Sequence, residues 1–191
     1  MTHADFIGNF NEQFNCEKFL AIIKAQAGDK RNPLTPYGAG VELDPELALA
    51  KKEMQENWQN AGYLENNSVE WINYYPEDHF DRSYVQQFAD LVNADPLNIW
   101  VSTIPVGKCV PWHWDIIKDY KNYKNDPSMV RYSFFLDKPQ IGQVFVLNTQ
   151  AFHFVEQGAV YKWHKWDEWH LGFNCGFETK YMFHFVGKSR Q

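Results

Sequence analysis

Residues 130–136 read Val-Arg-Tyr-Ser-Phe-Phe-Leu, a run of β-branched and aromatic side chains that is typical of a β-strand. Three segments of the same kind surround it, at 98–104, 143–148 and 179–186. Gly, Pro, Asn and Asp separate these segments at short intervals, and such spacing is typical of a β-sandwich, barrel or jelly roll. The second half of the chain is therefore expected to form a β-rich core.

Residues 1–97 are instead helical and loop-rich in character. Apolar side chains at helical spacing predict helices over 15–26, from 45 to about 58, and over 81–93. Asp44 and Asp81 are expected to cap the second and third of these helices. At 191 residues the chain is too short for two well-buried domains. We therefore expect residues 1–191 to form a single domain, with the helices packed on the β-rich core.

The composition argues against several classes of protein. Eighteen Lys and Arg against 24 Asp and Glu give a net charge of −6, whereas a general nucleic-acid binder needs a basic surface. No apolar run reaches the length of a membrane span, and the N-terminal stretch has no secretion signal, so we expect a soluble, cytoplasmic protein. Cys16, Cys109 and Cys175 form no CxxC pair and indicate neither a disulfide framework nor a zinc ribbon.

The motif that carries chemistry is Pro-Trp-His-Trp-Asp at 111–115. Residues two apart in a strand point to the same side, so His113 and Asp115 can converge on one metal ion. By the same alternation, Trp112 and Trp114 are expected to point the other way and to pack. The pair alone is a weak signal, and a third ligand is needed.

His170 supplies that third ligand, in the segment Glu-Trp-His-Leu-Gly-Phe-Asn at 168–174. Ten residues later, Lys180 opens an otherwise apolar strand, where a lysine needs an anion or a solvent outlet to offset its burial. Two histidines and one carboxylate leave three open positions on a metal, which suits non-haem Fe(II). A nearby cation suits a dicarboxylate co-substrate.

The segments 111–115, 130–136, 158–163, 169–170 and 178–181 together resemble the Fe(II)/2-oxoglutarate-dependent dioxygenases. The resemblance is to the aspartyl/asparaginyl β-hydroxylase-like branch and covers residues 98–187. It implies a mainly β fold with N-terminal helices and a double-stranded β-helix (jelly roll, cupin-like) catalytic core. It also implies that one Fe(II) is held by three ligands: His113, Asp115 and His170.

The same resemblance assigns the co-substrate site. It implies that Lys180 binds the distal carboxylate of 2-oxoglutarate, that Ser102 hydrogen-bonds the same group, and that Arg131 contacts the co-substrate or substrate. The implied activity uses O2 to hydroxylate a small molecule or a protein side chain, with release of succinate and CO2. Lys180 stands where this branch more often has Arg. Lysine keeps the positive charge but cannot form the bidentate hydrogen bonds that a guanidinium makes with a carboxylate. The retained Asp115 favours hydroxylation over halogenation.

Several alternatives remain open. The core suits a cupin-like metalloenzyme that uses Mn, Ni or Zn without 2-oxoglutarate, or a non-catalytic jelly-roll binding protein. The polar cluster at 164–168 offers His164, Asp167 and Glu168 as zinc ligands, although a connecting loop explains it better. His79 belongs to a second His-x-Asp pair and is expected to be structural. The segment 116–129 is either a lid over the site or a solvated connection.

One further histidine has two possible roles. His184 alternates with aromatic residues and is expected to be packed and satisfied. If Lys180 points inward, His184 shares its face and could orient a ligand from behind.

Overall fold

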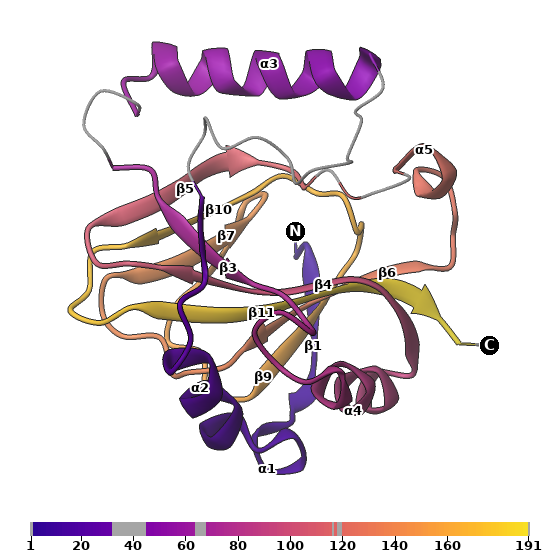
Figure 1. Ribbon diagram of the computed structural model, residues 1–191. Coiled ribbons are helices and arrows are strands. Elements are labelled where there is room, and N and C mark those ends of the chain that lie inside the picture. Colours follow the sequence, from indigo (N-terminus) through magenta and orange to yellow (C-terminus); the bar gives the residue numbers. More distant parts are fainter. Residues whose placement is uncertain (1, 32–44, 64–67, 116, 118–119, 191) are drawn as a thin grey trace.

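Two antiparallel sheets form the body of the protein (Figure 1), as a computed structural model shows for residues 2–31, 45–63, 68–115, 117 and 120–190. The larger sheet has the strand order β1-β9-β6-β11-β4-β3-β2, and the smaller has β5-β10-β7-β8. The strands are β1 (Ala4–Asn9), β2 (Asp29–Arg31), β3 (Trp71–Tyr74), β4 (Ala94–Ile104), β5 (Lys108–His113), β6 (Met129–Phe135), β7 (Gln143–Leu147), β8 (Gln150–Phe152), β9 (Ala159–Trp163), β10 (His170–Asn174) and β11 (Lys180–Ser189). The helices are α1 (Asn11–Phe14), α2 (Cys16–Lys24), α3 (Pro45–Asn60), α4 (Arg82–Val92) and α5 (Tyr120–Tyr123).

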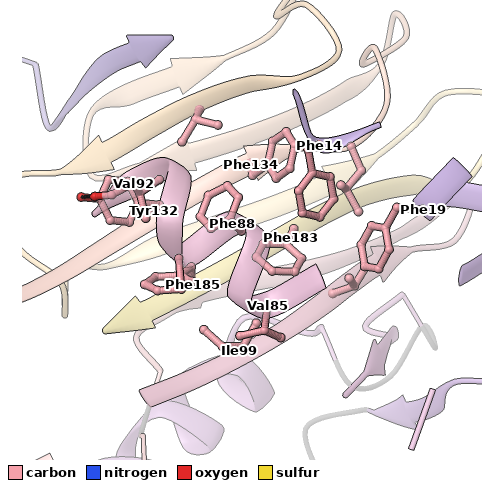
Figure 2. Packing of buried hydrophobic residues seen from close by; sticks show 14 of the residues in the cluster. Phe14, Phe19, Val85, Phe88, Val92, Ile99, Tyr132, Phe134, Phe183 and Phe185 are labelled. Atoms are coloured by element: carbon pink, nitrogen blue, oxygen red, sulfur yellow. Dashed lines mark hydrogen bonds between the residues drawn. The ribbon is translucent and has the colours of Figure 1, made fainter. Parts of the chain in front are cut away.

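The outer face of the larger sheet is covered by α1, α2 and α4 (Figure 1). Alternate residues of β4, β6 and β11 point to this side and bury aromatic rings against the helices. Figure 2 shows Phe88 of α4 between Phe134 and Phe183, and its ring stacks on that of Phe134 with centroids 5.1 Å apart. This cluster fixes the side of the sheet that faces away from the site.

The inner face of the larger sheet packs against the smaller sheet. Phe135 and Met182 of the larger sheet share one buried cluster with Phe145 and Leu147 of the smaller. Two facing antiparallel sheets of this kind form a double-stranded β-helix, so the expected mainly β fold with N-terminal helices is confirmed. Side chains on the remaining part of the inner face line the site described below.

The longest elements agree with the sequence patterns. The three expected helices correspond to α2, α3 and α4, and the four expected strands to β4, β6, β7 and β11. Asp81 accepts a hydrogen bond from the backbone N–H of Ser83 at 2.7 Å, as its capping role requires. The expected cap Asp44 and the turn cluster at 32–38 lie outside the described residues.

A strand at the 111–115 motif was also expected and corresponds to β5, although it ends at His113. Six described strands were not expected from the patterns, three of them within residues 1–97. These three are β1, β2 and β3, which lie at the two ends of the larger sheet. Strands β2 and β3 have only three and four residues, too few for alternation to be distinctive. Strand β10 carries a glycine at its centre, which lowers its strand propensity.

Helix α3 lies on the opposite side of the strands from α1, α2 and α4 (Figure 1). Trp58 attaches it to the smaller sheet, because its Nε1 donates to the carbonyl of Trp112 at 2.8 Å. Nearer its start, Leu47 is buried in a cluster with Trp100 and Trp166. Among the described helices, none is long and apolar enough to cross a membrane.

Candidate metal centre

Three side chains from the smaller sheet converge at one end of β5 and β10. Strand β5 ends at His113, β10 begins at His170, and the two residues are paired in register. Asp115 follows two residues after β5. Its Oδ2 lies 3.2 Å from Nε2 of His170, and its Oδ1 lies 3.7 Å from Nε2 of His113. Among the described residues, these are the only three metal-ligating side chains whose ligand atoms gather closely, all within 4.8 Å.

Both histidines present Nε2 to this centre because Nδ1 is engaged elsewhere. Nδ1 of His113 lies 2.7 Å from the carbonyl of Pro111, and Nδ1 of His170 lies 3.0 Å from the carbonyl of Glu168. A carbonyl only accepts, so each Nδ1 carries the proton and each Nε2 keeps a lone pair for a metal. Burial and the neighbouring His170 lower the pKa of His113 to about 3, and burial also lowers the pKa of His170. Neutral imidazoles of this kind are the form that binds a cation.

Arg131 of β6 reaches this centre from the larger sheet. It is only 1% exposed, and its Nη2 donates to Oδ2 of Asp115 at 2.5 Å. Its guanidinium lies 3.7 Å from the centroid of the Trp163 ring. Burial by itself raises the pKa of Asp115, but Arg131 together with His170 and His113 outweighs burial and keeps that pKa well below its usual range. Arg131 therefore orients the carboxylate and is not among the residues that line the cavity.

The three ligands open into a cavity of about 500 Å³ between the sheets. Lys180, the first residue of β11, lines its inner end and is 1% exposed. Among the described residues, its Nζ donates one hydrogen bond, to the carbonyl of Val144 at 2.8 Å. Burial lowers the pKa of Lys180 to about 7, although Asp137 partly offsets this effect. A buried ammonium with donors to spare is a fitting partner for a carboxylate.

Gly172 and Ile104 line the same cavity as Lys180. Gly172 shares a face of β10 with His170, and a Cβ built on it would lie 3.9 Å from Nζ of Lys180 and 2.7 Å from Cδ1 of Ile104. Ile104 therefore packs closely against Gly172, and the space for an anion near Lys180 is that of the cavity itself. The donor set and this cavity fit an Fe(II) ion together with a short dicarboxylate.

Ser102 and His184 form another part of the cavity wall. Oγ of Ser102 lies 2.8 Å from Nε2 of His184, and both residues line the cavity. The His184 ring stacks on Trp100 with centroids 4.8 Å apart. Burial and the charge of Arg131 hold the pKa of His184 well below its usual range, so the ring is neutral. His184 is thus packed, as expected, and fixes the Ser102 hydroxyl at the cavity wall. It is not fully satisfied, because its Nδ1 is buried and has no hydrogen-bond partner among the described residues.

The outer end of the cavity is built from segments in which the sequence showed no chemistry. Trp58 of α3 lines it, and its ring meets that of His113 edge to face at 6.3 Å. Trp71, Asn73 and Tyr75, on and next to β3, line it as well. The alternation in Trp-Ile-Asn-Tyr-Tyr at 71–75 was the available signal, because it places these three side chains on one face.

Each tryptophan of the 111–115 motif meets only part of the expectation. Trp112 is not among the residues that line the cavity, but it is 40% exposed and is not packed in the core. Trp114 packs against the cluster of Trp100 and Trp166, but it lines the same cavity as His113. The alternation that predicted otherwise does not extend this far, because β5 ends at His113.

The other polar groups singled out in the sequence lie apart from the centre. Nδ1 of His79 accepts from the backbone N–H of Tyr75 at 3.1 Å, which is a structural role. Nε2 of His164 lies 3.0 Å from Asp5, whereas Glu168 lies 3.3 Å from His3, so these two do not share an ion. In the segment 116–129, Ile117 and Tyr123 contact the Trp100 cluster. Residues 116, 118 and 119 lie outside the described residues.

Comparison with known proteins gives remote structural similarity only. No protein-family model matches the chain, and no curated protein matches it. The viral collagen prolyl hydroxylase of Paramecium bursaria Chlorella virus-1, solved with 2OG, aligns over 100% of this chain and 97% of its own, at 10% identity and a TM-score of 0.45. A Pseudomonas putida prolyl-4-hydroxylase aligns over 94% and 100%, at 12% identity and a TM-score of 0.39.

A third similar structure has a different description. A predicted oxalate decarboxylase from Thermotoga maritima aligns over 62% of this chain and 81% of its own, at 13% identity and a TM-score of 0.38. These values are too low to assign an activity, a cofactor or a substrate to this chain.

Proposed function

We propose that this protein is an Fe(II)- and 2-oxoglutarate-dependent oxygenase that hydroxylates a small molecule. The observation that carries the proposal is one cavity that holds both a two-histidine, one-carboxylate centre and a buried lysine. Such a ligand set with open positions is typical of non-haem Fe(II) oxygenases.

Each residue has a definite part in this proposal. His113, Asp115 and His170 hold the metal, and Arg131 keeps the Asp115 carboxylate ionised and oriented. Lys180 binds the far carboxylate of 2-oxoglutarate, with the Ser102 hydroxyl next to it. When bound, the iron and 2-oxoglutarate supply the O2 chemistry that inserts one oxygen atom into a C–H bond and releases succinate and CO2.

The protein also controls access of water to this chemistry. The walls around the three ligands are largely aromatic, with Trp58, Trp100, Trp114 and Phe145 among the lining residues. Such walls leave few places for loosely held water, and this favours reaction with the bound substrate over side reactions.

The test is an anaerobic titration of the metal-free protein with Fe(II) and then with 2-oxoglutarate. We expect a saturable visible charge-transfer band when 2-oxoglutarate joins the iron. His170→Ala should abolish metal binding and the band. Lys180→Met should still bind the metal, but the charge-transfer band should saturate only at much higher concentrations of 2-oxoglutarate. His164→Ala is the matched control, because His164 is exposed and paired with Asp5, and should behave as the wild type.

Two other outcomes identify the alternatives. Metal binding with no band at any 2-oxoglutarate concentration would contradict the proposal and favour a cupin-like metalloenzyme. Absence of metal binding would contradict both and leave a non-catalytic binding role for the cavity.

A further inference from the structure

We propose that the outer end of the cavity binds a planar, uncharged ring compound that donates a hydrogen bond from an amide-type N–H to Asn73. This inference rests on the proposed function, because it names the substrate class of the same site. It is carried by the wall of the cavity beyond the metal ligands, from β2, β3 and α3.

Charge is balanced at this end of the cavity. Among the described residues that line it beyond the metal ligands, two are acidic, Asp29 and Asp78, and two are basic, Arg31 and Lys51. Asp29 and Arg31 neutralise each other, with Oδ2 and Nη2 3.5 Å apart. The inner end, by contrast, holds the buried ammonium of Lys180. A dianionic co-substrate is thus directed inward, and the outer end favours a ligand without net charge.

Aromatic rings provide the surface for that ligand. Trp71 and Tyr75 stand on either side of Asn73 along one face of the β3 segment, and Trp58 lines the cavity from α3. Flat π faces of this kind favour flat rings over saturated ones, because stacking adds to the burial of apolar area. The cavity volume of about 500 Å³ must also hold the co-substrate, so the ligand is small.

Asn73 supplies the directional contact. Its Nδ2 donates to the Tyr75 hydroxyl at 3.0 Å, while its Oδ1 is buried and has no hydrogen-bond partner among the described residues. Buried polar atoms nearly always have partners, and this one belongs to a residue that lines the cavity. An N–H of the ligand that donates to Oδ1 would give this atom its missing hydrogen-bond partner. The ring of the ligand would then lie between Trp71 and Tyr75.

The experiment compares four small probes on the full-length protein saturated with Fe(II) and 2-oxoglutarate without O2. Benzamide is planar, uncharged and an N–H donor. Cyclohexanecarboxamide lacks the planar ring, methyl benzoate lacks the N–H, and benzoate carries a charge. Binding is read from tryptophan fluorescence and from a shift of the charge-transfer band. We expect benzamide to bind tightest, with methyl benzoate roughly tenfold weaker, as the loss of one hydrogen bond implies.

The variant Asn73→Leu tests whether Asn73 contacts the ligand directly or has only a structural role. This variant should weaken the affinity for benzamide roughly tenfold. The affinity for methyl benzoate should stay within about twofold of the wild-type value, because methyl benzoate has no N–H that could bind Asn73. Asn57→Leu, at an exposed position of α3, is the matched control. It should leave the affinities for benzamide and methyl benzoate unchanged. The ranking of the four probes needs no variant, so it remains decisive if Asn73→Leu fails to fold.

The inference is overturned if cyclohexanecarboxamide or benzoate binds as tightly as benzamide, if no probe binds, or if Asn73→Leu weakens benzamide and methyl benzoate equally. Failure of the proposed function has a different signature, namely absence of the charge-transfer band. The fluorescence titrations can then be run on the metal-free protein, because the walls of the outer end contain no metal ligand other than the ring edge of His113.

Discussion

Lys180 shows how position changes the chemistry of a single residue. A lysine on a surface is charged at every physiological pH, but burial lowers the pKa of this one from 10.5 to about 7. Its role in the proposed function requires the charged form, because a carboxylate binds an ammonium and not a neutral amine. Binding of 2-oxoglutarate above pH 7 must therefore be coupled to the uptake of one proton.

The affinity for 2-oxoglutarate should consequently fall as the pH rises through 7. We expect it to weaken by about tenfold from pH 6 to pH 8, measured by charge-transfer titration at fixed Fe(II). Metal binding should change little over this range, because the pKa values of His113 and His170 are both lowered and their rings are already neutral. Lys180→Arg is the control. A guanidinium stays charged over this range, so the affinity of this variant for 2-oxoglutarate should not depend on pH. Equal pH dependence in both proteins would contradict this role of Lys180.

The metal centre was the part of the site that could be predicted at the level of residues. Strand spacing indicated the pair His113 and Asp115, whereas His170 was assigned from its place in the β-rich half and from the resemblance to the dioxygenases. The three ligand atoms do lie within 4.8 Å of one another. The partner of Arg131 could not be predicted. It depends on the side chain of Asp115 crossing from the smaller sheet to the larger, and such pairs between sheets leave no periodic signal in the chain.

At the scale of elements, β10 links the candidate metal ligands to the surroundings of Lys180. Its first residue is the candidate ligand His170, and Gly172, on the same face, lies close to Ile104 and to Nζ of Lys180. The pattern did not reveal β10 because this five-residue strand has polar residues at both ends and a glycine at its centre. The longer elements were predicted because α2, α4 and β11 carry enough apolar residues at a regular period.

Gly172→Ala should therefore weaken 2-oxoglutarate binding by at least about tenfold and leave metal binding unchanged. The new methyl group would lie 3.9 Å from Nζ of Lys180, where the proposed carboxylate binds, and 2.7 Å from Cδ1 of Ile104. The double variant with Ile104→Val removes that Cδ1 contact and separates the two effects. If the double variant regains full 2-oxoglutarate affinity in charge-transfer titrations, the loss arose from crowding of Ile104, and the carboxylate does not bind next to residue 172.

At the scale of the whole molecule, one ion pair joins the two sheets at the metal centre. Arg131 belongs to the larger sheet, and Asp115 follows a strand of the smaller. Without a metal, Arg131 provides the main compensation for the buried charge of Asp115. A bound cation would share this task and would tie three ligands together, so the metal should stabilise the fold as a whole.

We expect Fe(II) at 100 times its Kd to raise the melting temperature by about 5–10 °C, which corresponds to about 2.7 kcal/mol. Arg131→Met should lower the stability of the metal-free protein by about 3 kcal/mol, the lower end of the range for buried pairs, because it leaves the partly buried Asp115 carboxylate without its charged partner. The metal should then raise the melting temperature of this variant more than that of the wild type, since it takes over the compensation of Asp115. Differential scanning fluorimetry under argon, with EDTA in the reference sample, measures both effects.

Arg82→Met is the matched control for this comparison. Arg82 also pairs with a carboxylate, that of Glu77, but both side chains are mostly exposed to solvent. Its loss should change the melting temperature of the metal-free protein little and leave the increase with Fe(II) as in the wild type. If Arg131→Met instead behaved like Arg82→Met, the pair between the sheets would contribute nothing to the fold. Asp115 would then not owe its orientation to Arg131, and the metal would act only within the smaller sheet.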